Sequence, residues 1–321
     1  MAVTRGDVNA TLKDLTIIAE DTVAMTRPNL YPLICSVKPE DGAYTRIPIP
    51  ANLPFPKKFE GERSKQGKDV TVVQAYNQDT YELSVELDSD LVKNAKAYEM
   101  ADIVREATMS AKLFPDYLAS QAVINGSSSK AYDGVNFYGT THKYANTGSN
   151  AINNTVAKTG QTVTQLATDL SSAVTAIRTF LDNQGRLLNP LARQGTDQLL
   201  VHCPVALQQP FRQLLNASWI PVSAPVTTSG TAAAPTGFNS LQGIADIFAD
   251  GYLDVNSTTT WYLHYVGMPQ RPFVFLENYG LQVSVLGFGS EYEVQTNKVL
   301  IALKQRFVLG YYRFDRSVKV S

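Results

Sequence analysis

One segment, residues 91–124, limits the possible folds of this chain more than any other. Its apolar residues recur at steps of three or four, which is the spacing of a single buried helix face. They are Met100, Val104, Ala107, Ala111, Phe114, Leu118 and Ala122. A helix of this length would extend about 45–50 Å, far beyond the mean helix of about 11–12 residues. Pro115 lies inside it and removes the hydrogen bond to the carbonyl of Ala111, so we expect a kink or a break there.

A charged, proline-containing stretch precedes this helix and separates two predicted strands. Residues 47–56 hold four prolines, and residues 57–69 hold almost no apolar side chain, so neither can build a core. The residues on both sides have the alternation and composition of β-strands. We therefore predict a long two-stranded hairpin with a polar tip, whose charged residues contact another subunit. These residues are Lys57, Lys58, Glu60, Glu62, Arg63, Lys65, Lys68 and Asp69.

The remainder of the chain mixes helices and strands without an internal repeat. Residues 162–183 and 204–217 are predicted helices on either side of a buried strand at 198–203. The late segment 299–312 is rich in β-branched and aromatic residues, as strands are. The long irregular connection 125–160 is of a kind that is usually functional or forms an interface. This order of elements predicts an α+β fold and not a βαβ repeat.

Composition narrows the classes of function. Charged residues make up 18% of the chain, below the ~25% of typical soluble domains, which fits a surface largely covered by partners. The net charge of −1 argues against a dedicated nucleic-acid binder. The sequence has no secretory signal and no apolar run near ~18 residues, so we expect folding in a cytoplasm and no membrane contact. Two cysteines, Cys35 and Cys203, cannot provide a disulfide framework.

No arrangement of residues predicts catalysis, a metal site or a cofactor site. The segment Gly61–Lys68 has one residue too many between its glycines for a phosphate-binding loop, and Asp69 stands where that loop needs Ser or Thr. His202 and Cys203 would point to opposite faces of a strand, so they cannot act as a nucleophile and its base. We expect structural roles for His202 and His264, and no metal site at His142, which has no cysteine or second histidine nearby. A turn explains the following acidic trio better than a cation site does: Asp246, Asp250 and Asp254.

Two blocks of opposite charge invite pairing. Residues 77–106 carry eight acidic and three basic side chains, and residues 298–321 carry six basic and one acidic side chain. Such blocks can pair within one subunit or between neighbours. Two solvated faces of ordinary polarity explain them almost as well. If the blocks pair between neighbours, Arg313 and Arg316 are the contact residues that we expect on the basic side.

The layout resembles the major head subunits of Mu-like tailed bacteriophages over residues 57–320. After the hairpin and the long helix, the segment Tyr132–Tyr138 leads to Thr141 and His142, as in that family. Later segments are similar to the family as well: Trp261–Leu263, Arg271–Glu277 and Phe307–Phe314. The family tends to have an acid before the loop histidine and a proline after it. Thr141 and Lys143 occupy these positions here, so we assign no role to His142.

The resemblance implies the Hong Kong 97-type capsid fold, whose copies build an icosahedral shell around double-stranded DNA. It divides the chain into an N-terminal arm (1–45), an extended loop that overlaps a neighbour (46–80), a peripheral domain with a long spine helix (81–144), an axial domain (145–290) and peripheral C-terminal strands (291–321). Some relatives carry a cleaved N-terminal scaffolding segment. This sequence starts directly with its arm, so we expect the scaffold to be a separate protein or already removed.

The resemblance also implies partners and a location. The partners are further copies of the chain in hexamers and pentamers, a portal, a scaffold, decoration proteins, and packaged DNA that is bound without sequence specificity. No cofactor and no membrane is implied. The protein would belong to the virion capsid after assembly in the cytoplasm of a host bacterium.

Another virion protein, such as a tail-tube or ring-forming protein, is the main alternative. A tail-tube protein would be mostly β-structure and would not need a helix of ~45 Å. An enzyme would need converging titratable groups, which the sequence does not show. We therefore predict a non-enzymatic major capsid protein that assembles with itself.

Overall fold

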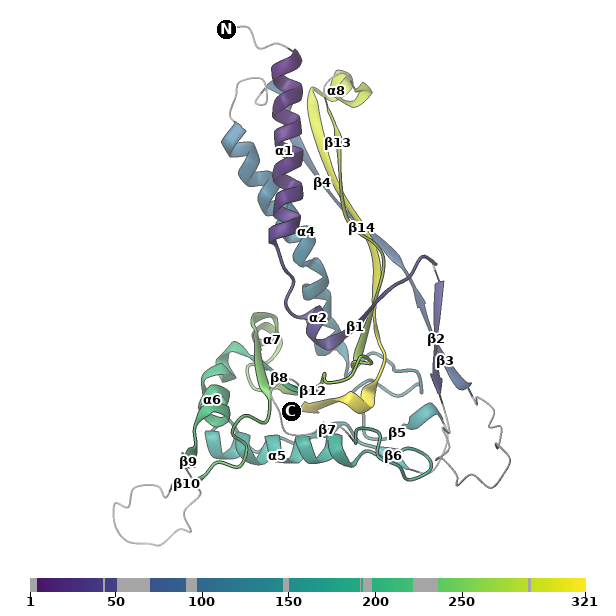
Figure 1. The fold of residues 1–321 in the computed structure, drawn as a ribbon, viewed down its shortest axis with the longest axis vertical. Coiled ribbons are helices and arrows are strands. Elements are labelled where there is room, and N and C mark those ends of the chain that lie inside the picture. Colours follow the sequence, from purple (N-terminus) through teal and green to yellow (C-terminus); the bar gives the residue numbers. More distant parts are fainter. Residues whose placement is uncertain are drawn as a thin grey trace, which may run out of the picture.

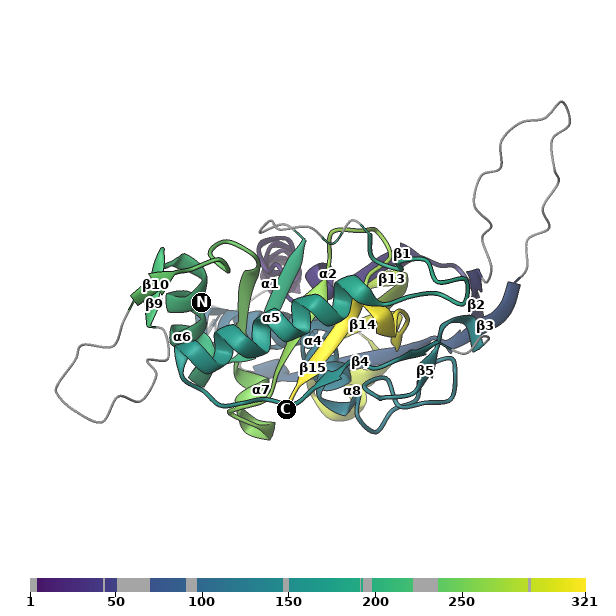
Figure 2. The same cartoon turned by 90° about the horizontal axis from the view of Figure 1, so that it is seen from below.

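A tall column stands on a wider base in the computed structural model of this chain (Figure 1). The structure describes residues 5–42, 44–50, 70–90, 97–146, 150–190, 192, 198–221, 236–287 and 290–321. We use "column" for the long helices and the four-stranded sheet beside them, and "base" for the five-stranded sheet and the helices around it. A two-stranded ribbon projects from one side of the molecule (Figures 1 and 2).

The column is built from helices and strands that are far apart in the sequence. They are α1 (Arg5–Met25), α2 (Tyr31–Ile34), β1 (Cys35–Pro39), β4 (Asp79–Asp88), α4 (Ala97–Asn125), β13 (Phe273–Leu286), α8 (Glu291–Thr296) and β14 (Lys298–Tyr311). The sheet has the order β1-β13-β14-β4. Leu15 of α1, Val104 of α4 and Ile301 of β14 meet in its apolar core. The long predicted helix is confirmed as α4, and residues 91–96 lie outside the described residues.

The base is built around a five-stranded sheet with the order β11-β8-β12-β15-β7. Its elements are β5 (His142–Lys143), η1 (Tyr144–Asn146), β6 (Ala151–Ile152), β7 (Thr155–Val156), α5 (Val163–Thr179), β8 (Leu199–Pro204), α6 (Val205–Asn216), β9 (Trp219–Pro221), β10 (Thr236–Phe238), β11 (Asp246–Asp250), α7 (Gly251–Asn256), β12 (Trp261–Tyr265), η2 (Phe314–Arg316) and β15 (Ser317–Val320). β8 and β12 are buried along their whole length, as central strands covered on both faces are. In the described parts of the chain, no helix combines the length and apolarity needed to traverse a lipid bilayer.

Strand pairing departs from the predicted division of the chain at two places. The prediction assigns residues 145–290 to the axial domain, yet β13 within this range pairs with β14 over almost its whole length, so β13 belongs to the column. The prediction also groups residues 291–321, yet β15 lies in the base between β12 and β7. The physical reason for the position of β15 is η2, which lies between β14 and β15 and turns the chain out of the column sheet and into the base.

The projecting ribbon consists of β2 (Tyr44–Pro50) and β3 (Val70–Asn77), which pair in antiparallel register from Tyr44↔Asn77 to Pro50↔Val70. These two strands are the predicted stem of the hairpin. Two prolines lie in β2, where a ribbon with open edges does not need their missing N–H groups. The residues between the strands, 51–69, lie outside the described residues.

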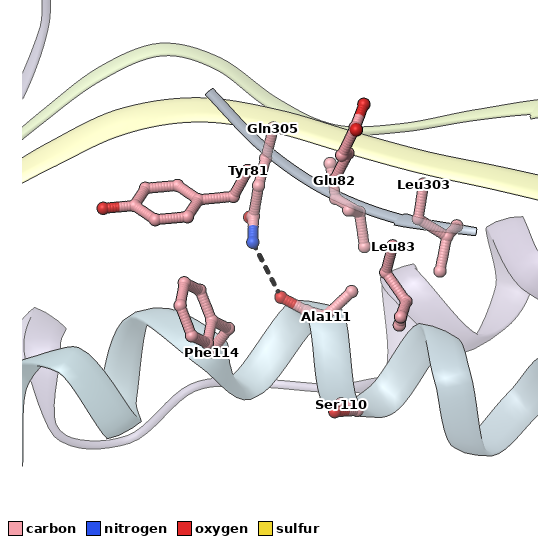
Figure 3. A pocket seen from close by; sticks show the side chains of 9 residues that line it. Tyr81, Glu82, Leu83, Ser110, Ala111, Phe114, Leu303 and Gln305 are labelled. Carbon is pink, nitrogen blue, oxygen red and sulfur yellow. Dashed lines mark hydrogen bonds between the residues drawn. The ribbon is translucent and has the colours of Figure 1, made fainter. Parts of the chain in front are cut away.

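Pro115 does not break α4, which runs without interruption from Ala97 to Asn125. Proline has no N–H group, so the Ala111 carbonyl loses its partner within the helix. The side-chain amide of Gln305, which is buried on β14, donates to this carbonyl at 2.9 Å (Figure 3). A cavity of about 240 Å³ adjoins this hydrogen bond and is lined by Phe114 and Leu303 among others. Of the predicted kink or break, the break is therefore wrong, because a neighbouring strand supplies the missing donor, and the kink stays a prediction.

Candidate assembly surfaces

The root of the ribbon is fixed to the body of the subunit. Ile47, Ile49 and Tyr76 are buried in the main apolar core, and the Tyr76 hydroxyl donates to the Tyr311 carbonyl at 2.7 Å. Gly310 leaves room for this ring, because a Cβ at that position would lie 2.3 Å from a Tyr76 ring carbon. The ribbon therefore leaves the junction of column and base in a defined direction.

The predicted contact residues at the tip of the ribbon lie outside the described residues. They are Lys57, Lys58, Glu60, Glu62, Arg63, Lys65, Lys68 and Asp69. Their contact with another subunit stays a prediction.

The other two predicted contact residues, Arg313 and Arg316, lie inside the subunit. Arg313 is 5% exposed and donates to both carboxylate oxygens of Asp315, at 2.7 Å each. Burial acts to lower the pKa of Arg313, but the attraction of Asp315 outweighs it and raises that pKa. Arg316 donates to the Gln270 carbonyl and lies over the ring of Tyr265. Both arginines hold the turn between column and base, and a role in contacts between subunits stays a prediction.

The two charge blocks meet within one subunit along β4 and β14. Lys298 forms an ion pair with Glu86, and Lys304 lies opposite Glu82 in the strand register. The Tyr292 hydroxyl also donates to Glu86, at 2.5 Å. Because the pair of Lys298 and Glu86 is exposed to solvent, it contributes little to stability.

A buried chain of hydrogen bonds links α4 to the base. Ser120 of α4 and His202 of β8 both donate to Asp250, at 2.6 and 3.0 Å. The other nitrogen of His202 lies 3.4 Å from Nε2 of His264, whose Nδ1 lies 2.9 Å from the Ser317 hydroxyl. Donors and acceptors match throughout when both imidazoles are neutral. The Tyr138 hydroxyl completes the chain at 2.9 Å from Ser317.

Burial and hydrogen bonds set the charge states of two groups in this hydrogen-bonded series, His264 and Asp250. It lowers the pKa of His264 well below 6.5, and the neighbouring His202 lowers it further. Burial acts to raise the pKa of Asp250, but the hydrogen bonds from His202 and Ser120 outweigh it and leave that pKa below its ordinary value. A neutral imidazole at His264 and an ionised carboxylate at Asp250 are therefore the stable states of these two groups.

This series of hydrogen-bonded side chains contains serine, histidine and aspartate, but it is not a catalytic triad. Ser120 bonds to the carboxylate and not to an imidazole, so no base activates its hydroxyl. Ser317 does contact an imidazole, but Ser317 and His264 are fully buried and no substrate can reach them. The expected structural roles of His202 and His264 are confirmed. Sequence reasoning missed their connection, because its members come from five different elements and leave no local spacing signal.

The remaining candidate ligands and nucleophiles also have structural roles. Asp250 caps α7 through Tyr252 N–H, and Asp254 accepts from the first N–H groups of α6. No group of three or more potential metal ligands occurs among the described residues. Cys35 and Cys203 are free and buried, and burial raises the pKa of Cys203 to about 12. That thiol therefore stays protonated and unreactive.

His142, for which the sequence predicts no role, also has a structural role. The ring is fully buried, lies 2.7 Å from Asp133 and 3.1 Å from the Phe137 carbonyl, and stacks on Phe314 at 4.0 Å. It holds the loop after α4 against η2. In the sequence, the segment Tyr132–Tyr138 is the feature that could have indicated this role, because it supplies both Asp133 and Phe137.

Solved structures of low sequence identity share the fold. The procapsid of bacteriophage JBD30 matches with a TM-score of 0.53 and 13% identity, over 99% of this chain and 75% of that chain. The capsid of cyanophage P-SCSP1u matches with a TM-score of 0.56 and 10% identity, over 92% and 88%. A virus-like particle from Pyrococcus furiosus matches with a TM-score of 0.51 and 9% identity, over 96% and 98%. The predicted α+β fold of the Hong Kong 97 type is confirmed.

The sequence itself identifies the family. No curated protein sequence matches the chain significantly. The profile of the family described as Mu-like prophage major head subunit gpT matches residues 19–181, about half of the chain. This segment contains α4 and the segment Tyr132–Tyr138 that carries the resemblance. The chain thus belongs to the Mu-like prophage major head subunit family, whose members are structural and not enzymatic proteins and form the capsid of the virion.

Proposed function

We propose that copies of this chain form the hexamers and pentamers of an icosahedral shell around double-stranded DNA, and that residues 46–80 of each copy overlap a neighbour. The ribbon of β2 and β3 carries this proposal. In the described part of the chain the two strands pair only with each other, while their root is anchored by Tyr76. A lone two-stranded ribbon is marginally stable in water, so an adjacent subunit would give it a surface to pack on.

Contact between two different surfaces of the same chain, repeated by symmetry, is the kind that closes a shell. In this proposal the column is the peripheral domain and the base is the axial domain. The net charge of −1 suits an inner wall that neither repels DNA strongly nor binds a particular sequence.

Further partners belong to the same proposal. One structural neighbour is described as the capsid of bacteriophage JBD30 decorated with minor capsid protein trimers, with a TM-score of 0.55 and 13% identity. We propose that a shell of this chain likewise binds a decoration protein on its outer face. A portal and a scaffold complete the proposed set, with assembly in the cytoplasm of the host bacterium.

Deletion of residues 57–68 tests the overlap. The shortened subunit should keep the circular dichroism spectrum and melting temperature of the full chain, because it loses no described core residue. It should form few particles in electron microscopy and sedimentation. A second variant, in which Gly and Ser replace these residues at equal length, keeps the length of the segment but removes its charge. It therefore shows whether assembly requires the charged side chains or only the length. Normal particles from the deletion variant would refute the overlap.

A further inference from the structure

The cavity next to the hydrogen bond between Gln305 and Ala111 lies between α4 and the column sheet (Figure 3). It has a volume of about 240 Å³, and its wall is mostly apolar, with Leu281 of β13 and Leu303 of β14 among its residues. Leu83 of β4 also lines it and is 38% exposed, and β4 is the edge strand of the sheet. The cavity therefore reaches the surface beside β4, so a molecule from solvent can enter it.

The wall of the cavity suits an aromatic ring. Tyr81 and Phe114 line it with their ring centroids 5.0 Å apart and their planes at 62°. Such edge-to-face arrangements are preferred contacts of aromatic rings, and a further ring can extend them. An engineered apolar cavity of about 150 Å³ in another protein stays dry and binds benzene. The larger volume here has room for a ring system of about nine non-hydrogen atoms.

One polar atom of a buried side chain at the cavity has no partner. Gln305 lines the cavity and is 6% exposed, and its amide nitrogen donates to the Ala111 carbonyl at 2.9 Å. Within the described part of the chain, no hydrogen bond reaches its amide oxygen, Oε1. An acceptor that is removed from water without a donor costs free energy, so a ligand that donates to it gains a favourable hydrogen bond.

The charges around the cavity favour a neutral ligand. Among the described residues that line the cavity there is no lysine, arginine or histidine, so an anion would lose its hydration without gaining a counterion. Glu82 borders the cavity, but its carboxylate points away from α4 (Figure 3), so a cation would find no partner there either. A neutral aromatic ring with an N–H or O–H group matches both the apolar wall and the amide oxygen.

We propose that this cavity binds a free, neutral aromatic molecule of about nine non-hydrogen atoms, whose N–H or O–H group donates to Oε1 of Gln305. The ring packs against Tyr81 and Phe114. Because the same amide holds the Ala111 carbonyl, the bound molecule also stabilises the turns of α4 around Pro115. The site lies within one subunit, so this inference goes beyond the proposed function and does not depend on assembly.

Indole is a suitable probe, because it has about this size and a single N–H donor. Benzofuran is its matched control, since it has the same shape but an oxygen in place of the N–H group. In calorimetric titration of unassembled subunits, we expect a dissociation constant for indole on the order of 0.1–1 mM and a several-fold larger one for benzofuran. Saturating indole should slow hydrogen exchange in α4 around Pro115. No binding of indole well above this range, or equal affinity for benzofuran, would overturn the proposal.

Two substitutions on β4 test the location of the site. Leu83 points toward α4 (Figure 3), so Leu83→Trp places a large ring in the cavity and should abolish the binding of indole. Ser84→Trp is the matched control, because Ser84 is exposed and successive side chains of a strand point to opposite faces. This control should bind indole as the wild-type chain does, and the melting temperatures show that both variants are folded. Equal affinities of the two variants would place the site elsewhere and overturn the proposal.

A second pair of variants tests the hydrogen bond. Gln305→Leu removes the amide oxygen, and Pro115→Ala in the same chain gives the Ala111 carbonyl a backbone donor again, which keeps α4 intact. This double variant should bind indole and benzofuran with equal affinity, whereas Pro115→Ala alone should keep the preference for indole. A preference for indole that survives in the double variant would overturn the proposal.

Assembled particles distinguish a free ligand from a side chain of a neighbouring chain. We expect indole to bind to particles with the affinity that it has for unassembled subunits. Binding that is lost on assembly would show that a side chain of another subunit fills the cavity, and would overturn the proposal. Failure of the chain to form particles under any condition would overturn the proposed function, whereas titration of subunits would still decide this inference.

Discussion

Replacement of Gln305 by leucine should show how α4 tolerates a proline in its interior. Leucine keeps most of the side-chain volume but removes the amide that donates to the Ala111 carbonyl at 2.9 Å. This carbonyl would then be buried without a partner, which costs about 1–3 kcal/mol. We expect the free energy of unfolding of the unassembled subunit, measured with urea, to fall by this amount. Gln305→Glu should cost at least as much, because it sets a carboxylate against the carbonyl.

Pro115→Ala provides the decisive background. Alanine restores the backbone N–H that the Ala111 carbonyl lacks, so Gln305 is no longer its only donor. Gln305→Leu should therefore cost less in this background, with a coupling of about 0.5–3 kcal/mol between the two positions. Hydrogen exchange should locate the loss in the turns of α4 around Pro115. The same cost in both backgrounds would refute the reasoning, since the amide would then act through some other contact.

Three further perturbations have expected outcomes. Asp315→Ala leaves Arg313 buried without its partner and should lower the free energy of unfolding, measured with urea, by about 3–5 kcal/mol. Lys298→Ala removes one partner of an exposed ion pair and should change that free energy by no measurable amount. Equal effects of the two substitutions would contradict this reasoning. Below about pH 6.5 the unfolded chain gains a proton at His264 that the folded chain does not bind, since burial keeps that pKa well below 6.5. Acid should therefore lower stability by up to about 1.4 kcal/mol per pH unit, and His264→Gln should reduce this slope; an unchanged slope would count against it. Tyr76→Phe should cost about 1 kcal/mol and speed hydrogen exchange in β2 and β3, and unaltered exchange would exclude an anchoring role for the hydroxyl.

Periodicity made α4 and α5 predictable, because each buries one face and repeats its apolar residues accordingly. The cap on the Ala111 carbonyl was not predictable, since Gln305 lies 194 residues further along the chain. Arg313 and Arg316 illustrate another limit. Charged residues are expected at the surface, and the burial of these two arginines depends on partners such as Asp315 and the Gln270 carbonyl. Trp219 of β9 shows the reverse, because it is 63% exposed although an apolar residue is expected in the core, and nothing local indicates that exposure.

The position of β15 has a consequence for the order of folding. Strand β7 near residue 155 finds its partner only at residue 319, and β12 takes its second neighbour from the same late strand. Until residues 317–320 have left the ribosome, the base cannot close. A growing chain therefore exposes the edges of β7 and β12 until β15 docks between them. A subunit whose synthesis stops before β15 would lack a complete base and could not join a growing particle.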